Sequence, residues 1–146
     1  MPARDLILFR FHEDIRLCKD RIATLRFFNP DTPIYGLYGG PAGEFPNVRR
    51  SLGSELESVH LFKHRSRKWK WLHPDLGVKH WFKEFGHTLE FDYLFDYEYD
   101  ILAAAPLRRL YPKINEQSIA LSAVTKLSNV ENRWNWTSSA KERPNS

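Results

Sequence analysis

The sequence predicts an α/β domain built on an open, mostly parallel sheet, and three observations lead to that prediction. Residues 6–11 form a short, almost continuous apolar run, which is typical of a strand covered on both faces. Residues 14–28 repeat apolar side chains at helical spacing, and residues 33–38 have the pattern of a second strand. A strand, a helix and a strand in this order favour a parallel pair joined by a right-handed crossover.

The boundaries of these elements follow from capping and turn residues. Asp14 can cap the start of the helix, and Asn29-Pro30 ends it because the residue before a proline avoids the helical region. Residues 41–56 are rich in Gly, Pro and Ser, which predicts a loop or a weakly helical segment. Residues 58–62 are the third strand candidate.

The second half of the chain predicts one more helix and a strand tipped with carboxylates. Pro74 can occupy the first turn of a helix that stops near Gly86. In the following segment, residues 91–107, charged and bulky apolar side chains alternate with a period of two. Read as a strand, it points Asp96, Glu98 and Asp100 to one face and Phe95, Tyr97, Tyr99 and Ile101 to the other. Like charges this close are best accommodated by solvent or by a divalent cation between their oxygens.

Composition limits the class of protein. The chain has 146 residues, enough for one domain, with 22 Lys and Arg against 18 Asp and Glu. No apolar run reaches the roughly 18 residues of a membrane span, and the first residues lack a signal-peptide pattern. The single cysteine, Cys18, lies on the apolar face of the predicted helix and is expected to be a buried structural thiol. We therefore expect a soluble, cytoplasmic protein.

Three passages together carry a resemblance to a known family. They are LILFRFHEDIRLCKDRIATLRFFNPDTPIYGLYGG, WKWLHPDLGVKHWFKEFG and FDYLFDYEYDILAAAPL. They resemble the nucleotide-binding half of a GT-A type glycosyltransferase, over roughly residues 5–112. The resemblance implies a Rossmann-like sheet with helices on both faces, in which a later strand ends in an acidic DxD-type motif followed by a hydrophobic segment.

The acidic motif of that family matches Glu98-Tyr99-Asp100 as an ExD variant, and Asp96-Tyr97-Glu98 is an overlapping alternative frame. The later frame is preferred because it lies nearer the predicted strand end. The resemblance implies that Glu98 and Asp100 hold Mn²⁺ or Mg²⁺, which binds the diphosphate of a nucleotide sugar. Carboxylate oxygens suit these cations, and the cation neutralises charge on the leaving phosphates.

Other positions acquire weaker assignments from the same resemblance. Arg10, Phe11 and His12, at the end of the first strand, match the place where the family contacts the nucleoside. Asp75 matches a polar position near the base or ribose. Two lysines could reach phosphate, Lys70 and Lys79. No catalytic residue is assigned.

The resemblance also implies an incomplete enzyme. A GT-A enzyme continues past the acidic motif into an acceptor-binding half, whereas we expect residues 113–136 to form a partly helical extension and 137–146 a disordered tail. We therefore expect a truncated, donor-binding domain for a nucleotide-diphosphate sugar. It would be a transferase only if the acceptor half is supplied or dispensable, and the acceptor is unknown.

Two alternatives come from other features. The segment KHRSRKWK, residues 63–70, concentrates six basic residues, counting one histidine, and Trp69 and Trp71 can stack on bases. That combination suits single-stranded nucleic acid, although the acidic strand would repel it, so nucleic acid is the less favoured partner. The third interpretation is a non-catalytic interaction domain whose aromatic residues are core.

Overall fold

The computed structural model describes residues 4–63 and 74–116. The chain divides into two compact units, Met1–Leu107 and Arg108–Ser146, and the whole sheet belongs to the first. In the second unit the described part is short and includes one 3₁₀ turn, η3 (Ile114–Glu116). The predicted partly helical extension lies almost wholly, and the predicted tail entirely, outside the described residues, as do residues 64–73 with most of the basic aromatic segment.

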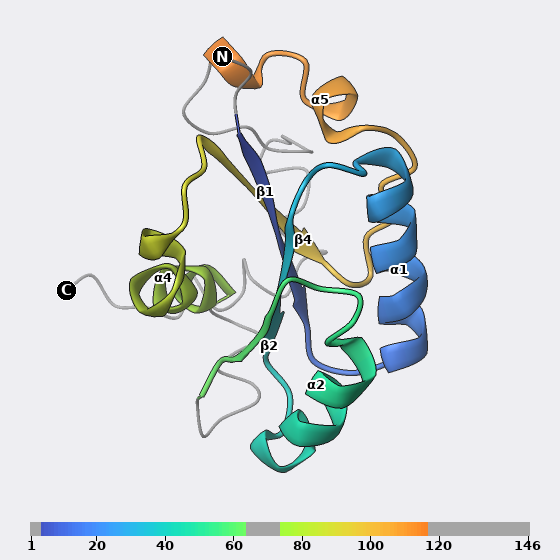
Figure 1. The fold of residues 1–146 in the computed structure, drawn as a ribbon, viewed down its shortest axis with the longest axis vertical. Helices are drawn as coiled ribbons and strands as arrows, with labels where there is room; N and C mark the ends of the chain where they lie inside the picture. Colours follow the sequence, from blue (N-terminus) through green and yellow to red (C-terminus); the bar gives the residue numbers. More distant parts are fainter. Residues whose placement is uncertain (1–3, 64–73, 117–146) are drawn as a thin grey trace, which may run out of the picture. The chain divides into compact units, whose positions relative to one another are not determined.

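The sheet has four strands, all parallel, in the order β3-β2-β1-β4 (Figure 1). The strands are β1 (Asp5–Phe11), β2 (Ile34–Tyr38), β3 (Val59–Leu61) and β4 (Tyr93–Glu98). β1 and β2 are joined through a helix, as the strand–helix–strand pattern predicted. The α/β class and the open parallel sheet are thus confirmed.

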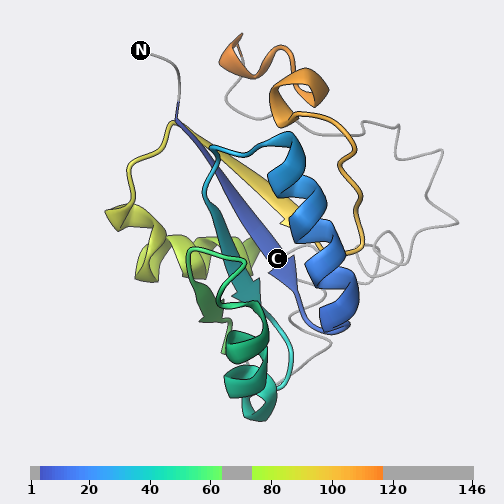
Figure 2. The same cartoon turned by 45° about the vertical axis from the view of Figure 1, so that its right-hand side comes forward.

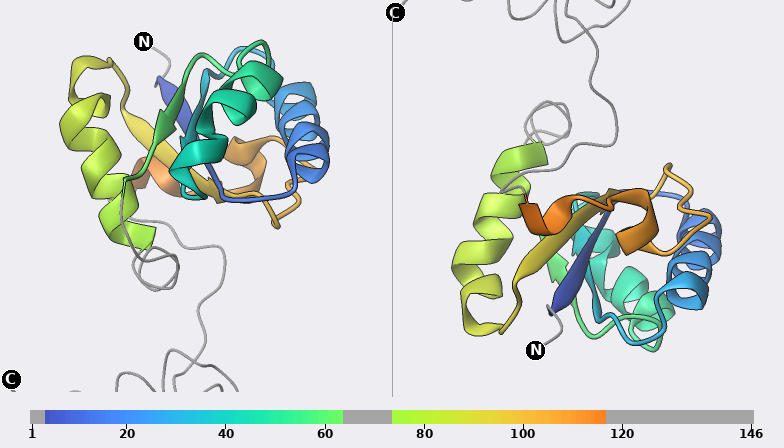
Figure 3. Two further views of the ribbon diagram at one scale, coloured as in Figure 1. Left: turned by 90° about the horizontal axis from the view of Figure 1, so that it is seen from below. Right: turned by 90° about the horizontal axis from the view of Figure 1, so that it is seen from above.

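Helices cover both faces of this sheet. Viewed along the strands, α1 (Ile15–Phe28) and α2 (Phe45–Leu52) lie on one face and α4 (Pro74–Glu84) on the other (Figure 3). Three short pieces complete the elements: η1 (Ala42–Glu44), η2 (Gly86–Thr88) and α5 (Leu107–Leu110). No helix in the described ranges is long and apolar enough to cross a membrane.

The ends of α1 are fixed by the predicted residues. Asp14 takes a left-handed backbone conformation with φ of 52°, and its Oδ1 accepts a hydrogen bond from the Leu17 N–H at 2.9 Å. At the other end, the side-chain amide of Asn29 donates to the Leu25 carbonyl oxygen at 2.9 Å. Asp14 therefore satisfies an N–H that has no partner within the helix, whereas the Leu25 carbonyl oxygen accepts both the side-chain amide and the backbone N–H of Asn29.

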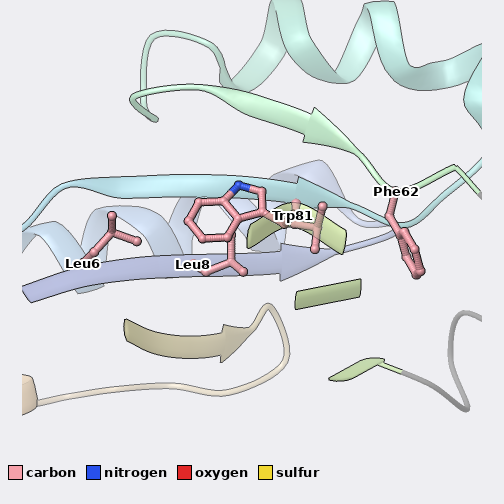
Figure 4. Packing of buried hydrophobic residues seen from close by; sticks show 5 residues of the cluster. Leu6, Leu8, Phe62 and Trp81 are labelled. Atoms are coloured by element: carbon pink, nitrogen blue, oxygen red, sulfur yellow. The ribbon is translucent and has the colours of Figure 1, made fainter. Parts of the chain in front are cut away.

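The two faces of the sheet have separate apolar cores. On one face, Trp81 of α4 is completely buried against Leu6 and Leu8 of β1, with Phe62 and Leu37 in the same cluster (Figure 4). On the other face, the buried residues of α1 include Cys18, Ile22 and Leu25. Burial of this much apolar surface on both sides explains why β1 is apolar at nearly every position.

Two predicted elements differ from the structure. The segment predicted as a loop or a weak helix contains a regular helix, α2, because Val48 and Leu52 bury an apolar stripe that the glycines and prolines around it obscure. The carboxylate strand is shorter than predicted, since β4 ends at Glu98 and the chain turns at Tyr99 and Asp100. Asp100 therefore does not continue the strand face shared by Asp96 and Glu98.

Candidate functional site at the ends of β1 and β4

The strand order reverses beside β1. From β1 the chain adds β2 and then β3 on one side, and it later returns to place β4 on the other side. In open α/β sheets, ligands bind beyond the carboxyl ends of the strands at such a switch point. Here that point is the end of β1 beside the end of β4, where Arg10 and Glu98 are paired in register.

Arg10 joins the two strands through carboxylates. Its Nε and Nη2 donate to both oxygens of Asp96, at 2.5 and 2.9 Å, and its Nη1 donates to Oε1 of Glu98 at 2.9 Å. The Arg10 side chain is only 17% exposed, whereas those of Asp96 and Glu98 are 38% and 45% exposed. Burial acts to lower the pKa of Arg10, and the hydrogen bonds and charges of the two carboxylates outweigh it and raise the pKa. The guanidinium thus stays charged and neutralises part of the acidic strand.

Glu98 and Asp100 lie on either side of a turn. Glu98 is the last residue of β4, and its carbonyl oxygen accepts a hydrogen bond from the Ile101 N–H at 3.1 Å. The intervening Tyr99 donates its N–H to the Arg10 carbonyl oxygen at 3.0 Å, so the turn is attached to β1. Asp100 is exposed, and it has no ion pair within the described part of the chain.

A second polar group adjoins the turn. His12 Nε2 lies 3.2 Å from Oε1 of Glu13, and the Tyr99 hydroxyl donates to the same oxygen at 3.4 Å. The rings of His12 and Tyr99 meet edge to face with centroids 5.0 Å apart. Burial, then the nearby charges of Glu13 and Asp100, raises the pKa of Tyr99, so its hydroxyl remains a hydrogen-bond donor at neutral pH.

The loop after β2 closes against this group. Gly39 donates its N–H to the Phe11 carbonyl oxygen at 2.8 Å. A Cβ placed on Gly40 would lie 2.5 Å from the His12 carbonyl oxygen, closer than real Cβ atoms approach any atom. Glycine at this position therefore allows the backbone after β2 to pack on the backbone after β1.

The sequence-predicted residues are only partly brought together. Arg10, His12, Glu98 and Asp100 gather at the ends of β1 and β4. Phe11 is 2% exposed and packs its ring against Tyr38 at 5.4 Å, so its side chain belongs to the core.

The two described candidates on α4, Asp75 and Lys79, make no ion pair with this group within the described part of the chain. Asp75 lies in the first turn of α4, and no hydrogen bond or ion pair between described residues joins it to the strand-end residues. Lys79 is exposed on the same helix, and Lys70 lies outside the described residues.

Sequence reasoning missed Glu13, Tyr99 and Gly40 as members of the site. Glu13 and Tyr99 are 86 residues apart, and only the register of β1 against β4 brings them into contact. A usable signal was Arg10 itself, because a charged residue that interrupts an otherwise apolar strand needs a charged partner on the same face.

The oxygen ligands available at this site are carboxylates. Glu98 offers the oxygen that Arg10 does not bind, and Asp100 offers a solvent-facing carboxylate. Within residues 4–63 and 74–116, no group of three or more His, Cys, Asp and Glu side chains is arranged to enclose a metal ion. A cation held by these carboxylates would therefore have one or two protein ligands and would complete its shell with water and phosphate.

Comparison of the chain with protein-family models, with curated proteins and with solved structures finds no match in any of the three.

Proposed function

We propose that this protein binds a nucleotide-diphosphate sugar at the carboxyl ends of β1 and β4, through a divalent cation held by Glu98 and Asp100. The observation that carries the proposal is the placement of the acidic turn beside Arg10 and His12, at the point where the strand order reverses. Their convergence supports a common ligand.

The carboxylates fit Mn²⁺ or Mg²⁺ in number and chemistry. Mg²⁺ usually keeps several waters and is bound by one or two carboxylates together with substrate phosphates. Glu98 is about half exposed and Asp100 is exposed as well, which leaves room for water and phosphate oxygens around them. When bound, such a cation would neutralise the charge of the diphosphate and stabilise its departure.

The residues of the chain itself balance the charge of the site. Asp96, Glu98, Asp100 and Glu13 would repel a diphosphate if nothing offset them. Arg10 neutralises one equivalent of that charge and fixes the Asp96 and Glu98 side chains on one face. His12 and Tyr99 add ring edges beside the turn, where the nucleoside would lie.

The proposal extends to activity and location. Glycosyl transfer would require an acceptor-binding part in addition to the residues described, so we propose donor binding as the function of this unit. A cytoplasmic location is supported by Cys18, which is an unpaired, buried thiol and fits a reducing compartment.

Calorimetric titration with UDP and GDP, each with and without Mn²⁺, tests the proposal. Asp100→Asn removes one proposed ligand, and Asp31→Asn is the matched control because Asp31 is an exposed aspartate in the loop between α1 and β2. We expect heat that requires Mn²⁺, that disappears in Asp100→Asn and that persists in Asp31→Asn. Binding that is independent of Mn²⁺, or that both variants weaken equally, would contradict the cation site.

A further inference from the structure

A cavity of about 500 Å³ lies at the opposite edge of the sheet from β4. It follows the open side of β3, which Figure 2 shows next to α2. Its lining comes from α2, from β3 with the residues on either side of it, and from Phe85 directly after α4. Two strands, β2 and β1, separate this cavity from the ends of β4, so it is not part of the site described above.

The lining is cationic. Arg49 and Lys63 are both exposed, and within the described part of the chain neither forms an ion pair. Among the described lining residues the acidic one is Glu57, and it has a cation beside it, because Nη2 of Arg26 lies 4.0 Å from its Oε1. The cavity therefore has two positive charges that no described carboxylate neutralises.

Neutral polar groups lie between those charges and the strand edge. The Ser58 hydroxyl, directly before β3, and Nε2 of His60 in β3 are 2.6 Å apart. Burial, and then the charge of Arg49, lowers the pKa of His60, so the imidazole is neutral at pH 7 and adds no third charge. Both groups can exchange their mutual hydrogen bond for one to a ligand oxygen.

Aromatic rings form the apolar part of the cavity. The Phe85 ring lies 3.6 Å from the His60 ring, centroid to centroid, and remains 42% exposed although it is large and apolar. On the α2 side, Phe45 stacks on Tyr38 with centroids 6.2 Å apart. Exposed aromatic surface beside unpaired cations is typical of a site that binds a ligand with both an apolar and an anionic part.

We propose that this cavity binds a small organic phosphate monoester, with the phosphate at Arg49 and Lys63 and the organic part against Phe45 and Phe85. A monoester dianion matches the two positive charges of Arg49 and Lys63 in sign and number, and the planar fork of a guanidinium is suited to bidentate contact with phosphate oxygens. The proposal rests on the cavity alone and does not depend on the cation site at Glu98 and Asp100.

The probe is phenyl phosphate, which combines a monoester dianion with one aromatic ring. Its binding is measured without divalent metal by following the ring resonances of His60 and the heat of titration. We expect saturable binding that shifts the His60 resonances, and at least tenfold weaker binding by either phenol or inorganic phosphate alone.

Two variants within the cavity lining and one control beside it decide whether the contact is specific. Arg49→Gln should weaken phenyl phosphate binding at least tenfold, and Lys63→Gln should weaken it independently. Arg50→Gln, which changes the next residue on α2 outside the cavity lining, should bind as the unaltered protein does. Because all three side chains are exposed, the variants should fold, and circular dichroism checks that they do.

Three outcomes would overturn the proposal. They are the absence of saturable binding to the folded protein, equal weakening by Arg49→Gln and Arg50→Gln, and binding that leaves the His60 resonances unmoved. Asp100→Asn should bind phenyl phosphate unchanged, which separates failure at this cavity from failure at the strand-end site.

Discussion

Arg10→Gln should lower the free energy of unfolding by a measurable amount, because the Arg10 side chain on β1 donates hydrogen bonds to two carboxylates of β4. The substitution removes the positive charge that two carboxylates share and leaves Asp96 and Glu98 facing each other on one strand. Both remaining side chains would be negative, so the pair would change from neutralised to repulsive.

The expected loss of unfolding free energy depends on how exposed the paired side chains are. Exposed ion pairs are worth about 0.2–1 kcal/mol each, and Asp96 and Glu98 are 38% and 45% exposed, so solvent screens both contacts. Arg10 itself is mostly buried, which favours the upper part of that range. Two such contacts give an expected loss of about 1–2 kcal/mol in the free energy of unfolding.

Urea unfolding followed by circular dichroism measures the loss. For a slope of about 2 kcal/mol per M, the midpoint of Arg10→Gln should fall by about 0.5–1 M. Arg4→Gln is the matched control, because Arg4 pairs with Glu90 through side chains that are 55% and 84% exposed. That exposed pair should be worth less than about 0.5 kcal/mol.

Two results would refute this reasoning. One is an Arg10→Gln midpoint within error of the unaltered protein, and the other is an equal loss in Arg4→Gln. Asp96→Asn, combined with Arg10→Gln in a double-mutant cycle, should show a coupling energy of about 1 kcal/mol, since the two side chains are in direct contact. Additive effects would mean that the ion pair contributes nothing.

Three further predictions follow from burial and close approach. Burial raises the pKa of Cys18 to about 12, so at pH 8 only about one thiol in 10⁴ is ionised. Its reaction with a disulfide reagent should therefore be rapid only after unfolding. Rapid labelling of Cys18 in the folded protein would contradict the raised pKa. The pKa of His60, lowered by burial and by Arg49, should appear as an NMR midpoint below 6.5. Because the unfolded chain binds a proton more readily, this residue's contribution to stability is complete above pH 6.5 and is lost as the pH falls through the folded-state midpoint. Gly40→Ala places a Cβ against the His12 carbonyl oxygen and should destabilise the folded protein by about 1–3 kcal/mol in thermal unfolding. The control is Gly43→Ala, whose Cβ meets nothing within 4 Å and which should change the stability by less than about 0.5 kcal/mol. Equal effects of the two substitutions would contradict the clash at Gly40.

The regular elements of the fold could be predicted because their signals are local. Asp14 caps α1, Asn29-Pro30 follows its end, and β1 shows as an apolar run that only Arg10 interrupts, so each signal lies within the element that it marks or next to it. The helix α2 was harder to see, since only two buried residues, Val48 and Leu52, mark its inner face.

The site was less accessible to sequence reasoning, because its contacts depend on strand register. Alternation along residues 91–107 correctly placed Asp96 and Glu98 on one face, yet it could not show that both carboxylates bind Arg10. It also extended the strand past Glu98, although a turn begins there. Pairing between residues more than eighty positions apart leaves no periodic trace in either segment.

The position of β1 in the middle of the sheet has a consequence for how the chain folds during synthesis. Its partner β2 follows after one helix, whereas its other partner, β4, emerges only after Leu61 and a further 37 residues (98 − 61). At about 5–20 residues per second, the edge of β1 that pairs with β4 keeps its backbone groups unpaired for about 2–7 s after β3 has been synthesised. The first three strands can assemble early, but the sheet is complete only when β4, which leads into the acidic turn, has been added. Completion of the core and assembly of the strand-end site are therefore the same event.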